Sequence, residues 1–271
     1  MRARVAIGAQ ELDVDLAQPL SLALPLDFAG PQPRHFDAPA ASARPYAVPG
    51  FSGAVAAGAS CNCAVITLTP HCNGTHTECV GHLTQEPLDA QRVMPAGLLP
   101  ALLVSVAPEP AAASGESSAP TPRRGDTLIT ARALAAAWRD TPFAPQALAI
   151  RTLPNEDAKR TRDYSGTTPP YLSQQAAELL VERGIWHLIV DVPSLDRTHD
   201  EGRLTAHRIF FGLPVDSVQL ATARRAAATV TELAFMPDEA ADGAYLAQLQ
   251  APALGGDAVP SRPLLYRVRV R

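Results

Sequence analysis

The chain has 271 residues, of which 46% are hydrophobic and 18% are charged, enough apolar material for a large core in one or two domains. The net charge of −4 excludes a global basic field that could hold a nucleic-acid backbone. Apolar runs stay shorter than the roughly 18 residues that span a bilayer, and the first ten residues lack the pattern of a secretory signal. We therefore expect a cytoplasmic protein without a nucleic-acid or membrane partner.

The first half of the chain mixes proline-rich and apolar segments. Residues 25–49 are rich in proline and predict an irregular, extended arm that lies over a core. Residues 64–68 form a short apolar run typical of a buried strand. Residues 97–106 form a longer apolar run, in which the strand is expected to begin after Pro100. Residues 107–126 have a low-complexity composition that cannot bury a core, which predicts a mobile surface insertion.

Capping residues predict two helices in the second half of the chain. Thr130 is a suitable N-cap for a helix that runs to Trp138. Ser173 is a suitable N-cap for a second helix, which continues to Arg183. Gly184 follows directly and is expected to end that helix, because glycine adopts the left-handed conformation found just beyond helix ends.

The strands of this half predict the fold class. Residues 147–153 and 185–192 are apolar strands on either side of the second helix, an order typical of a parallel pair. No repeat or linker divides the chain, so we expect residues 1–271 to form one α/β domain. The domain should have a central mixed sheet of the swivelling β/β/α type, outer helices and the extended N-terminal arm. The last strand, residues 262–271, is expected to carry Leu265, Arg267, Arg269 and Arg271 on one face, and its arginines at 267–271 are interpreted as a solvated edge that discourages strand pairing.

Four cysteines, Cys61, Cys63, Cys72 and Cys79, fall within a short stretch of the sequence. So few cysteines in a chain of this length cannot form a disulfide scaffold, and their clustering indicates metal or thiol chemistry. One interpretation is a structural zinc site made by Cys61, Cys63 and Cys72. The short C-x-C step and the lack of a second close pair argue against that site.

The densest set of possible metal ligands lies in residues 71–82, His-Cys-Asn-Gly-Thr-His-Thr-Glu-Cys-Val-Gly-His. Because side chains alternate along an extended chain, the even-numbered positions should share a face. Thiolate, imidazole and carboxylate are ligand types that zinc accepts, and mixed sets suit catalytic sites with an open position. The predicted face carries Cys72, His76, Glu78 and His82, whereas His71 and Cys79 should point the other way.

These residues resemble the motif of a known family. The stretch Gly74-Thr75-His76 with Glu78 and His82 is similar to His-x-Gly-Thr-His-x-Asp-x-Pro-x-His. That pattern is typical of the cyclase family of metal-dependent hydrolases, the group of bacterial kynurenine formamidase and isatin hydrolase. The resemblance runs from about residue 14 to the C-terminus. Further motifs agree in order along the chain, at residues 170–173, 191–196, 206–208 and 229–233.

The resemblance implies a divalent metal, zinc or manganese, bound as one or two ions. It also implies a small-molecule substrate, in which a C–N bond of an arylformamide or a lactam is hydrolysed. A neutral histidine near pH 7 suits the proton transfers of such a reaction. The implied metal ligands are Cys72 (or His71), His76, Glu78, His207 and Glu232, and the implied proton donor and acceptor is His82.

Three residues depart from the family pattern. Cys72 stands where the family has its first histidine, Glu78 where it has aspartate, and Val80 where it has proline. Each change is chemically tolerable at a divalent metal site. Together they keep two other functions open: a metal-binding protein of the same fold without turnover, and a structural zinc protein.

Three acidic residues and the N-terminal arm carry further expectations. Glu232 lies in an apolar run, where a carboxylate needs a partner such as a metal ion. Asp196 is interpreted as a turn residue, and Asp191, at the end of a strand, as a residue that orients a ligand. An arm without a core of its own often finds cover in a symmetric oligomer, which predicts a homodimer or homotetramer.

Overall fold

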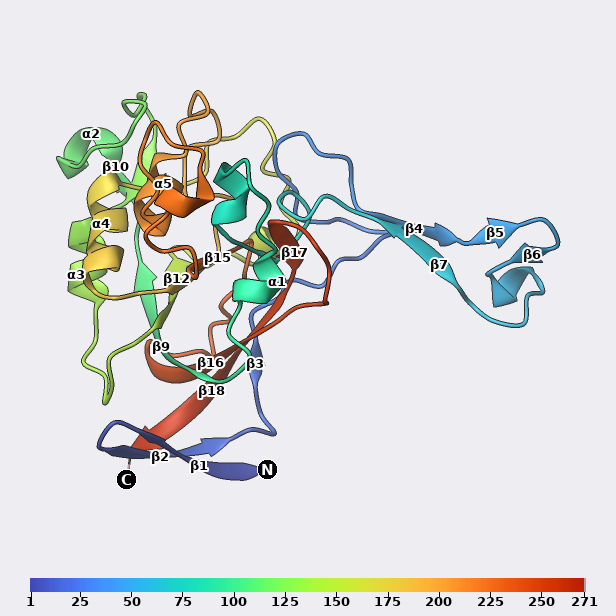
Figure 1. The fold of residues 1–271 in the computed structure, drawn as a ribbon, viewed down its shortest axis with the longest axis horizontal. Coiled ribbons are helices and arrows are strands. Elements are labelled where there is room, and N and C mark those ends of the chain that lie inside the picture. Colours follow the sequence, from blue (N-terminus) through green and yellow to red (C-terminus); the bar gives the residue numbers. More distant parts are fainter. Residues whose placement is uncertain (271) are drawn as a thin grey trace.

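A mixed β-sheet of eleven strands crosses residues 1–270, the part of the chain that the computed structural model describes (Figure 1). Ten of its strands follow the order β1-β2-β18-β16-β9-β12-β14-β15-β8-β17, and β3 pairs with β18. The strands are β1 (Arg2–Ile7), β2 (Gln10–Asp15), β3 (Leu20–Ser21), β8 (His76–Glu78), β9 (Leu99–Val106), β12 (Ala147–Thr152), β14 (His187–Val190), β15 (Thr229–Glu232), β16 (Gly243–Gln250), β17 (Ala258–Pro260) and β18 (Arg262–Val270).

The centre of this sheet is parallel. Strands β9, β12, β14 and β15 run in the same direction, and antiparallel strands extend the sheet on both sides. Every residue of β12 and β14 is buried, which explains their almost continuous apolar sequences. The predicted parallel pair is confirmed, since β12 and β14 are direct neighbours connected through α4 (Gln174–Glu182). The fold is therefore α/β with a central mixed sheet.

Side-chain caps fix where the two main helices begin. The hydroxyl of Thr130 accepts a hydrogen bond from the backbone N–H of Ala133, and Ser173 accepts one from Ala176, both as predicted. Gly184 follows α4 with a φ of +74°, which glycine adopts without strain. None of the helices in residues 1–270 is long and apolar enough to cross a membrane. The helices are α1 (Ala90–Val93), α2 (Ala111–Ser114), α3 (Ala131–Ala137), α4 and α5 (Thr205–Phe211), with 3₁₀ turns at Val55–Ala57, Val80–Leu83, Asp157–Arg160 and Leu220–Thr222.

The two faces of the sheet carry separate hydrophobic cores. On one face, α3, α4 and α5 pack against the sheet, with Leu148, Ile150 and Phe210 among the fully buried side chains (Figure 1). On the other face, Ala149 packs in a core that includes Leu22 from the N-terminal segment. Because successive residues of β12 point to opposite faces, this one strand contributes to both cores.

Residues 42–67 project from the body as a narrow arm (Figure 1). The strand predicted at residues 64–68 is confirmed, but the prediction that it is buried is wrong, since Ile66 is 55% exposed. A two-stranded ribbon has no second layer to cover its apolar side chains. The arm predicted at residues 25–49 lies partly on the body, where Ala41 is buried, and projects only beyond that residue. The arm's pairs are β4 (Ser42–Pro45) with β7 (Ala64–Thr67), and β5 (Ala47–Val48) with β6 (Phe51–Ser52).

Two strand predictions need correction. β9 begins at Leu99 and so includes Pro100, whereas the strand was expected to begin after this proline. Pro100 has no N–H to donate, but its carbonyl accepts a hydrogen bond from the backbone of Gln146. β18 is not an edge strand, because it pairs with β2 and β3 and with β16. Arg267 and Arg269 are nevertheless exposed as expected, and Arg271 lies outside the described residues.

Residues 107–126 contain short elements that contact the body. β10 (Glu109–Pro110) pairs with β11 (Thr127–Ile129), which pairs in parallel with β13 (Tyr171–Leu172). The Glu116 carboxylate accepts hydrogen bonds from the backbone of Ala131 and from the hydroxyl of Ser173, at the starts of α3 and α4. The mobility expected for this segment stays a prediction.

Candidate metal centre

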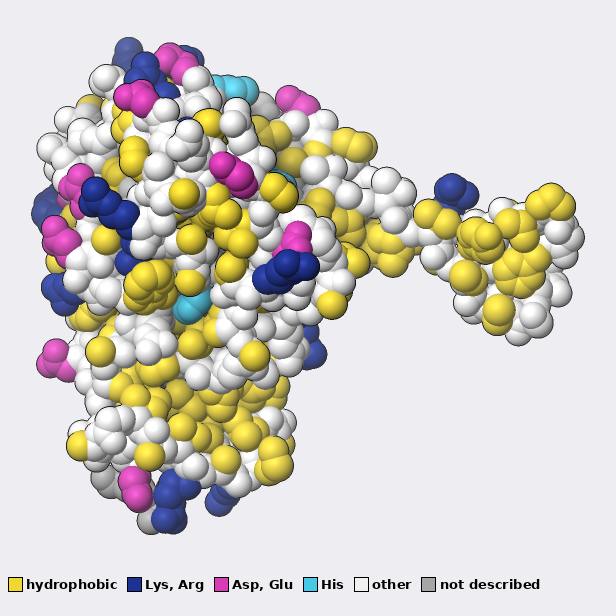
Figure 2. Space-filling model, in the orientation of Figure 1, with side chains coloured by type: hydrophobic (Ala, Val, Ile, Leu, Met, Phe, Trp, Pro, Cys, Tyr) yellow, Lys and Arg dark blue, Asp and Glu magenta, His cyan; other side chains and the backbone are white. Residues whose placement is uncertain are grey.

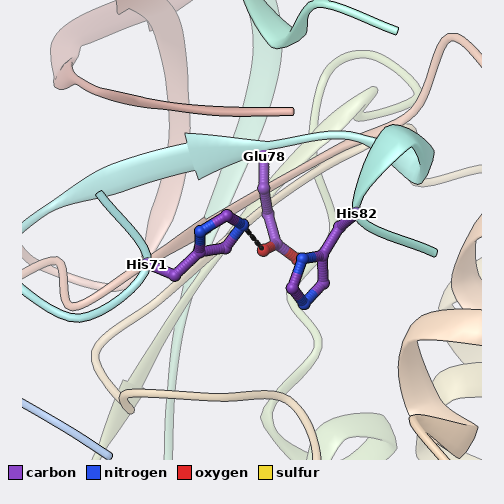
Figure 3. A group of neighbouring side chains, drawn as sticks. All are labelled: His71, Glu78 and His82. Atoms are coloured by element: carbon purple, nitrogen blue, oxygen red, sulfur yellow. Dashed lines mark ion pairs between the residues drawn. The ribbon is translucent and has the colours of Figure 1, made fainter. Parts of the chain in front are cut away.

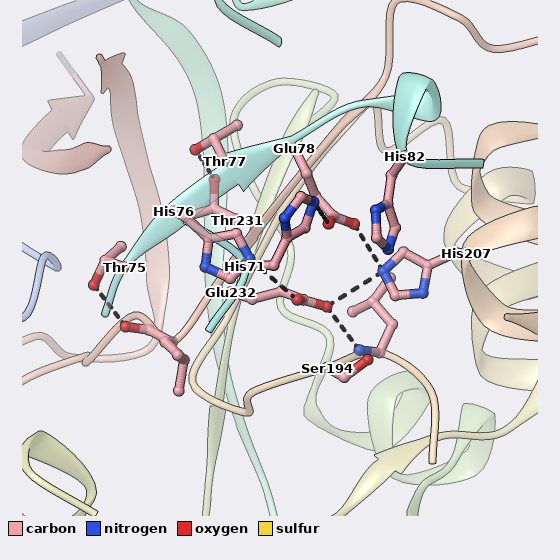
Figure 4. A network of polar contacts seen from close by, with 12 residues as sticks. His71, Thr75, His76, Thr77, Glu78, His82, Ser194, His207, Thr231 and Glu232 are labelled. Atoms are coloured by element: carbon pink, nitrogen blue, oxygen red, sulfur yellow. Dashed lines mark hydrogen bonds and ion pairs between the residues drawn. The ribbon is translucent and has the colours of Figure 1, made fainter. Parts of the chain in front are cut away.

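Two neighbouring strands, β8 and β15, carry the residues at the centre of the candidate site (Figure 4). In the antiparallel register, Glu232 on β15 faces His76 on β8. His76 and Glu78 lie on the same face of β8, as alternation predicted, whereas the Thr77 hydroxyl bonds to Thr231 on the other face. His76, Glu78 and Glu232 are all buried, so their charges act on one another with little screening by water.

The His76 ring has one nitrogen fixed and the other directed at a carboxylate. Nδ1 lies 3.1 Å from the carbonyl oxygen of Gly74, which can only accept, so Nδ1 carries a proton. Nε2 lies 3.4 Å from Oε2 of Glu232. Gly74 has a φ of +74°, and a Cβ at this position would lie 2.8 Å from a methyl group of Leu26. The positive φ of Gly74 therefore favours glycine at this position, whose carbonyl orients the His76 ring.

His207 reaches the same point from α5. Its Nδ1 lies 2.7 Å from Oδ2 of Asp196, and its Nε2 lies 2.8 Å from Oε1 of Glu78 and 3.4 Å from Oε1 of Glu232. Asp196 also accepts hydrogen bonds from the backbone N–H groups of Ala206 and His207. The interpretation of Asp196 as a turn residue is therefore wrong: it is buried and determines which nitrogen of His207 faces the carboxylates.

The carboxylates decide the charge of this cluster. Burial works against the charged form of His76, but the Glu232 carboxylate beside its Nε2 raises its pKa above the ordinary value. Burial also opposes charge on His207, yet the charge of Glu78 and the bond to Asp196 raise its pKa well above the ordinary value. The two imidazoles in turn hold the pKa of Glu232 far below its usual range, against the effect of burial. Positive charge is thus strongly favoured between Glu78 and Glu232.

Four polar atoms of the site are buried without a hydrogen bond of proper geometry to any residue in the described range 1–270. Such atoms are uncommon in folded proteins and cost stability, so each calls for an explanation. Imidazole nitrogen and carboxylate oxygen are ligands of zinc and manganese, and the ligand atoms of His76, Glu78 and Glu232 all lie within 4.8 Å of one another. The residues therefore fit a divalent metal ion. The four atoms are Nε2 of His71, His76 and His207, and Oε1 of Glu78.

A second group of possible ligands adjoins the first and shares Glu78 with it. Figure 3 shows the Glu78 side chain extending from β8 between the rings of His71 and His82. Nε2 of His71 lies 3.6 Å from Oε2 of Glu78, and the two rings stack with centroids 4.4 Å apart. Asp257 lies 2.9 Å from Nε2 of His71 and 3.2 Å from Nδ1 of His82 through the same oxygen, Oδ2. Two adjacent groups that share one carboxylate fit either one ion or a pair.

The structure brings His71, and not Cys72, into these groups. The chain turns at residues 69–73, where the backbone N–H groups of Cys72 and Asn73 both bond to the Thr69 carbonyl. The strict alternation assumed for residues 71–82 therefore begins only at β8, and the expectation that His71 points away is wrong. Cys72 is buried nearby, and burial together with the charge of Glu232 raises the pKa of its thiol.

The model of the family described as "Putative cyclase" matches residues 14–197, more than half of the chain. The chain belongs to the cyclase family. No curated protein matches the cyclase chain by sequence.

Solved structures share the fold of this cyclase at low sequence identity. A predicted metal-dependent hydrolase from Bacillus stearothermophilus is 16% identical with a TM-score of 0.56, over 92% of this chain and 98% of that one. Isatin hydrolase A from Labrenzia aggregata, bound to benzyl benzoate, is 15% identical with a TM-score of 0.55, over 92% and 93% of the two chains. An isatin hydrolase bound to the product analogue thioisatinate is 14% identical with a TM-score of 0.55, over 93% of each chain.

The cyclase chain does not gather its cysteines at one site. Cys61 and Cys63 are exposed on the arm, whereas Cys72 and Cys79 are buried in the body. The Cys79 thiol donates to the carbonyl of Leu88, and burial raises its pKa to about 12. Neither group of possible ligands contains a cysteine. A structural zinc site made by Cys61, Cys63 and Cys72 therefore has no support from the geometry.

Sequence reasoning missed Asp257 and misjudged Asp191. Asp257 lies in the loop between β16 and β17, where Gly255 and Gly256 precede it, and no local pattern connects it with residues 71–82. Only the pairing of β17 with β8 brings it to the site. Asp191 was expected to orient a ligand, but its carboxylate is bound by Lys159 and by Thr152.

Proposed function

We propose that this chain is a metal-dependent hydrolase that opens a C–N bond in an amide of the arylformamide or lactam type. The observation that carries the proposal is that three imidazole nitrogens without a hydrogen bond of proper geometry lie beside two buried carboxylates. The first group, His76, Glu78 and Glu232, would hold zinc or manganese together with His207. His71 would hold the same ion or a second one.

A bound divalent ion would polarise the substrate carbonyl and lower the pKa of a water molecule. The remaining work falls to side chains of the chain itself. His76 and His207 are held with their Nε2 atoms inward by Gly74 and Asp196, so no reorientation is needed when the ion binds.

His82 is the proposed proton carrier. Its Nδ1 lies 3.2 Å from Oδ2 of Asp257, so a proton on Nδ1 leaves the Nε2 lone pair free. Hydrolysis of an amide requires that the attacking water loses a proton and that the leaving nitrogen gains one, and Nε2 of His82 can do both in turn. The side chain of His82 is 29% exposed, unlike those of His76 and His207, so it can exchange protons with solvent.

The substrate class is supported by names among the similar structures. Two of these structures are isatin hydrolases, and isatin is a cyclic amide. The departures Cys72 and Glu78 do not remove the site, because His71 supplies an imidazole where Cys72 does not and the Glu78 carboxylate still reaches both His71 and His207.

Metal analysis combined with a substrate panel tests the proposal. Zinc and manganese are measured in the purified protein, and hydrolysis of N-formylkynurenine, isatin and small lactams is followed before and after chelation. The matched control is Glu232→Gln, which keeps the shape of the side chain but removes its charge. We expect bound metal, metal-dependent turnover of at least one amide, and loss of both in the control. Bound metal without turnover of any amide would contradict the hydrolase and favour a metal-binding protein of the same fold. Absence of metal uptake would overturn both of these functions.

We also propose that the chain forms a homodimer or homotetramer through its arm. In residues 42–67 Arg44 is the only charged residue, and Figure 2 shows apolar side chains over most of the arm. Val48, Val55 and Ile66 are 43%, 51% and 55% exposed, which is unfavourable for a ribbon in water. Light scattering should give a multiple of 28.6 kDa. A single-chain mass at micromolar concentration would contradict the proposal, and Ile66→Asp should shift the equilibrium toward that mass.

A further inference from the structure

His35 is a fully buried histidine whose two ring nitrogens make no hydrogen bond with any residue between 1 and 270. Its ring lies against Phe36, with centroids 3.9 Å apart, and meets the ring of Tyr164 edge-on at 6.5 Å. A neutral imidazole has one donor and one acceptor, and leaving both buried and unsatisfied costs free energy of folding. A phenylalanine would fill the same aromatic recess without that cost.

A second buried histidine shows what a structural role looks like in this chain. His187 is also nearly inaccessible, but its Nδ1 lies 2.9 Å from the hydroxyl of Thr229. Burial lowers the pKa of both His187 and His35 to about 4, so both rings are neutral at pH 7. The two differ in their partners: residues 1–270 provide a hydrogen-bond partner for His187 and none for His35.

The position of His35 connects it with the metal centre. Its backbone N–H donates to the carbonyl of Cys72, which directly follows His71. The charged and titratable groups that act on its ring are Glu232 on β15 and His199 in the loop before α5, besides Asp37 and Asp163. The charge of Glu232, a residue of the candidate metal centre, therefore acts on the His35 ring.

The backbone beside His35 is strained. Phe36 and Asp37 are consecutive non-glycine residues with φ of +53° and +54°, a conformation that costs free energy and concentrates at functional sites. Phe36 is 49% exposed, and its ring lies against the fully buried ring of His35.

We propose that His35 is a substrate-binding residue, whose ring hydrogen-bonds an uncharged carbonyl or N–H group of an aromatic amide held between Phe36 and the metal centre. The inference rests on the proposed hydrolase function and adds a residue outside the metal-ligand motif. A neutral imidazole selects a neutral polar group, because it forms no ion pair with a carboxylate. His35 positions the substrate and takes no part in the proton transfers assigned to His82.

The test compares His35→Phe with the matched control His187→Phe. Both variants replace a buried imidazole by an aromatic ring without polar atoms. We expect His35→Phe to keep its metal and to unfold at the parent's temperature or above it, whereas His187→Phe should unfold at least about 3 °C lower. A comparable loss of Tm in His35→Phe would overturn the proposal, because it would show that the ring is bound within the folded protein, for example by a buried water.

Substrate binding gives the second readout. With isatin or N-formylkynurenine, whichever the panel shows to be hydrolysed, His35→Phe should raise KM about tenfold and change kcat less than about threefold. In the His82→Ala background, calorimetric titration with the same amide should show the same loss of affinity. His35→Gln, which restores a donor and an acceptor, should recover part of it.

The outcomes separate this inference from the proposed function. Turnover by the parent with an unchanged KM in His35→Phe would overturn the role of His35 and leave the hydrolase intact. If no amide in the panel is hydrolysed or bound by the parent, the hydrolase proposal fails, and the role of His35 as an amide-binding residue fails with it.

Discussion

Two buried ionic clusters lie at the carboxyl ends of neighbouring parallel strands. They differ in how many of their polar atoms are hydrogen-bonded within the cluster. In the first, Nζ of Lys159 donates to the carbonyl and hydroxyl oxygens of Thr152 and to Oδ2 of Asp191. Asp191 accepts further hydrogen bonds from the backbone and hydroxyl of Thr152. In the second, Nε2 of His76, Nε2 of His207 and Oε1 of Glu78 make no hydrogen bond of proper geometry with residues 1–270.

The difference separates a structural cluster from a binding one. All three ammonium protons of Lys159 have acceptors, so the first cluster can connect β12 and β14 without any further group. The second cluster has two buried carboxylates at its centre and imidazole nitrogens around them, an arrangement that a divalent cation would satisfy.

His76→Ala should give the largest effect of the variants considered, because it removes a proposed direct ligand of the metal ion. Metal content should fall to the detection limit of elemental analysis. Hydrolytic activity should fall with it, to the detection limit of an assay in which less than one metal ion per chain is supplied. The measurement is metal per chain by elemental analysis beside turnover of the best amide. Retention of full metal content with normal activity would show that the two clusters do not differ as described.

His82→Ala should lower the hydrolysis rate by roughly 10²–10⁴-fold, the range for a lost general acid or base. Metal content should stay close to that of the parent, since His82 lies at the exposed side of the site beside Asp257. Should His82→Ala empty the site while His76→Ala does not, the roles of the two histidines would have to be exchanged.

Lys159→Met should show the opposite pattern from the ligand variants. The change leaves the buried Asp191 carboxylate without its cation, which costs about 3–5 kcal/mol of unfolding free energy. Metal per chain in the folded protein should not change. Denaturant unfolding of the chelated protein measures the stability, and adding Asp191→Asn should recover part of the loss. A loss of metal binding without a loss of stability would contradict the structural role.

The elements of the sheet and helices could be predicted from the sequence because their signals are local. Thr130 and Ser173 cap their helices through contacts three residues away, and apolar runs specify β12 and β14. The burial of residues 64–67 could not be predicted, because it depends on whether a second layer covers the ribbon. An apolar run reports the preference of its side chains and not their surroundings.

The candidate site divides in the same way. His76 and Glu78 follow from alternation along a single strand, and Glu232 from the cost of an unpaired carboxylate in an apolar run. His71 depends on a turn closed by backbone hydrogen bonds to Thr69, and Asp257 on a strand pairing across more than half of the chain. Such long-range contacts leave no periodic pattern in the sequence.

The smallest expected effect concerns pH and contrasts the two kinds of buried imidazole. The carboxylates raise the pKa of His76 and His207, whereas burial, helped by the charge of Arg225, lowers the pKa of His187 to about 4 from 6.5. Between these two values the unfolded chain binds a proton at His187 that the folded chain does not. The stabilisation from neutral His187 is therefore fully present above pH 6.5 and is lost as the pH falls through 4.

The His187→Gln variant should accordingly show a weaker fall in unfolding free energy between pH 6.5 and 4. The difference in slope from the parent is at most about 1.4 kcal/mol per pH unit, the value for one proton. Denaturant unfolding of the chelated proteins measures it, and the contribution of His35, which is the same in both, cancels in the difference. Equal slopes would show that His187 titrates alike in the folded and unfolded chains. Burial alone would then not keep an imidazole neutral in this chain. The difference in pKa between His187 and the site histidines would come only from the carboxylates beside His76 and His207.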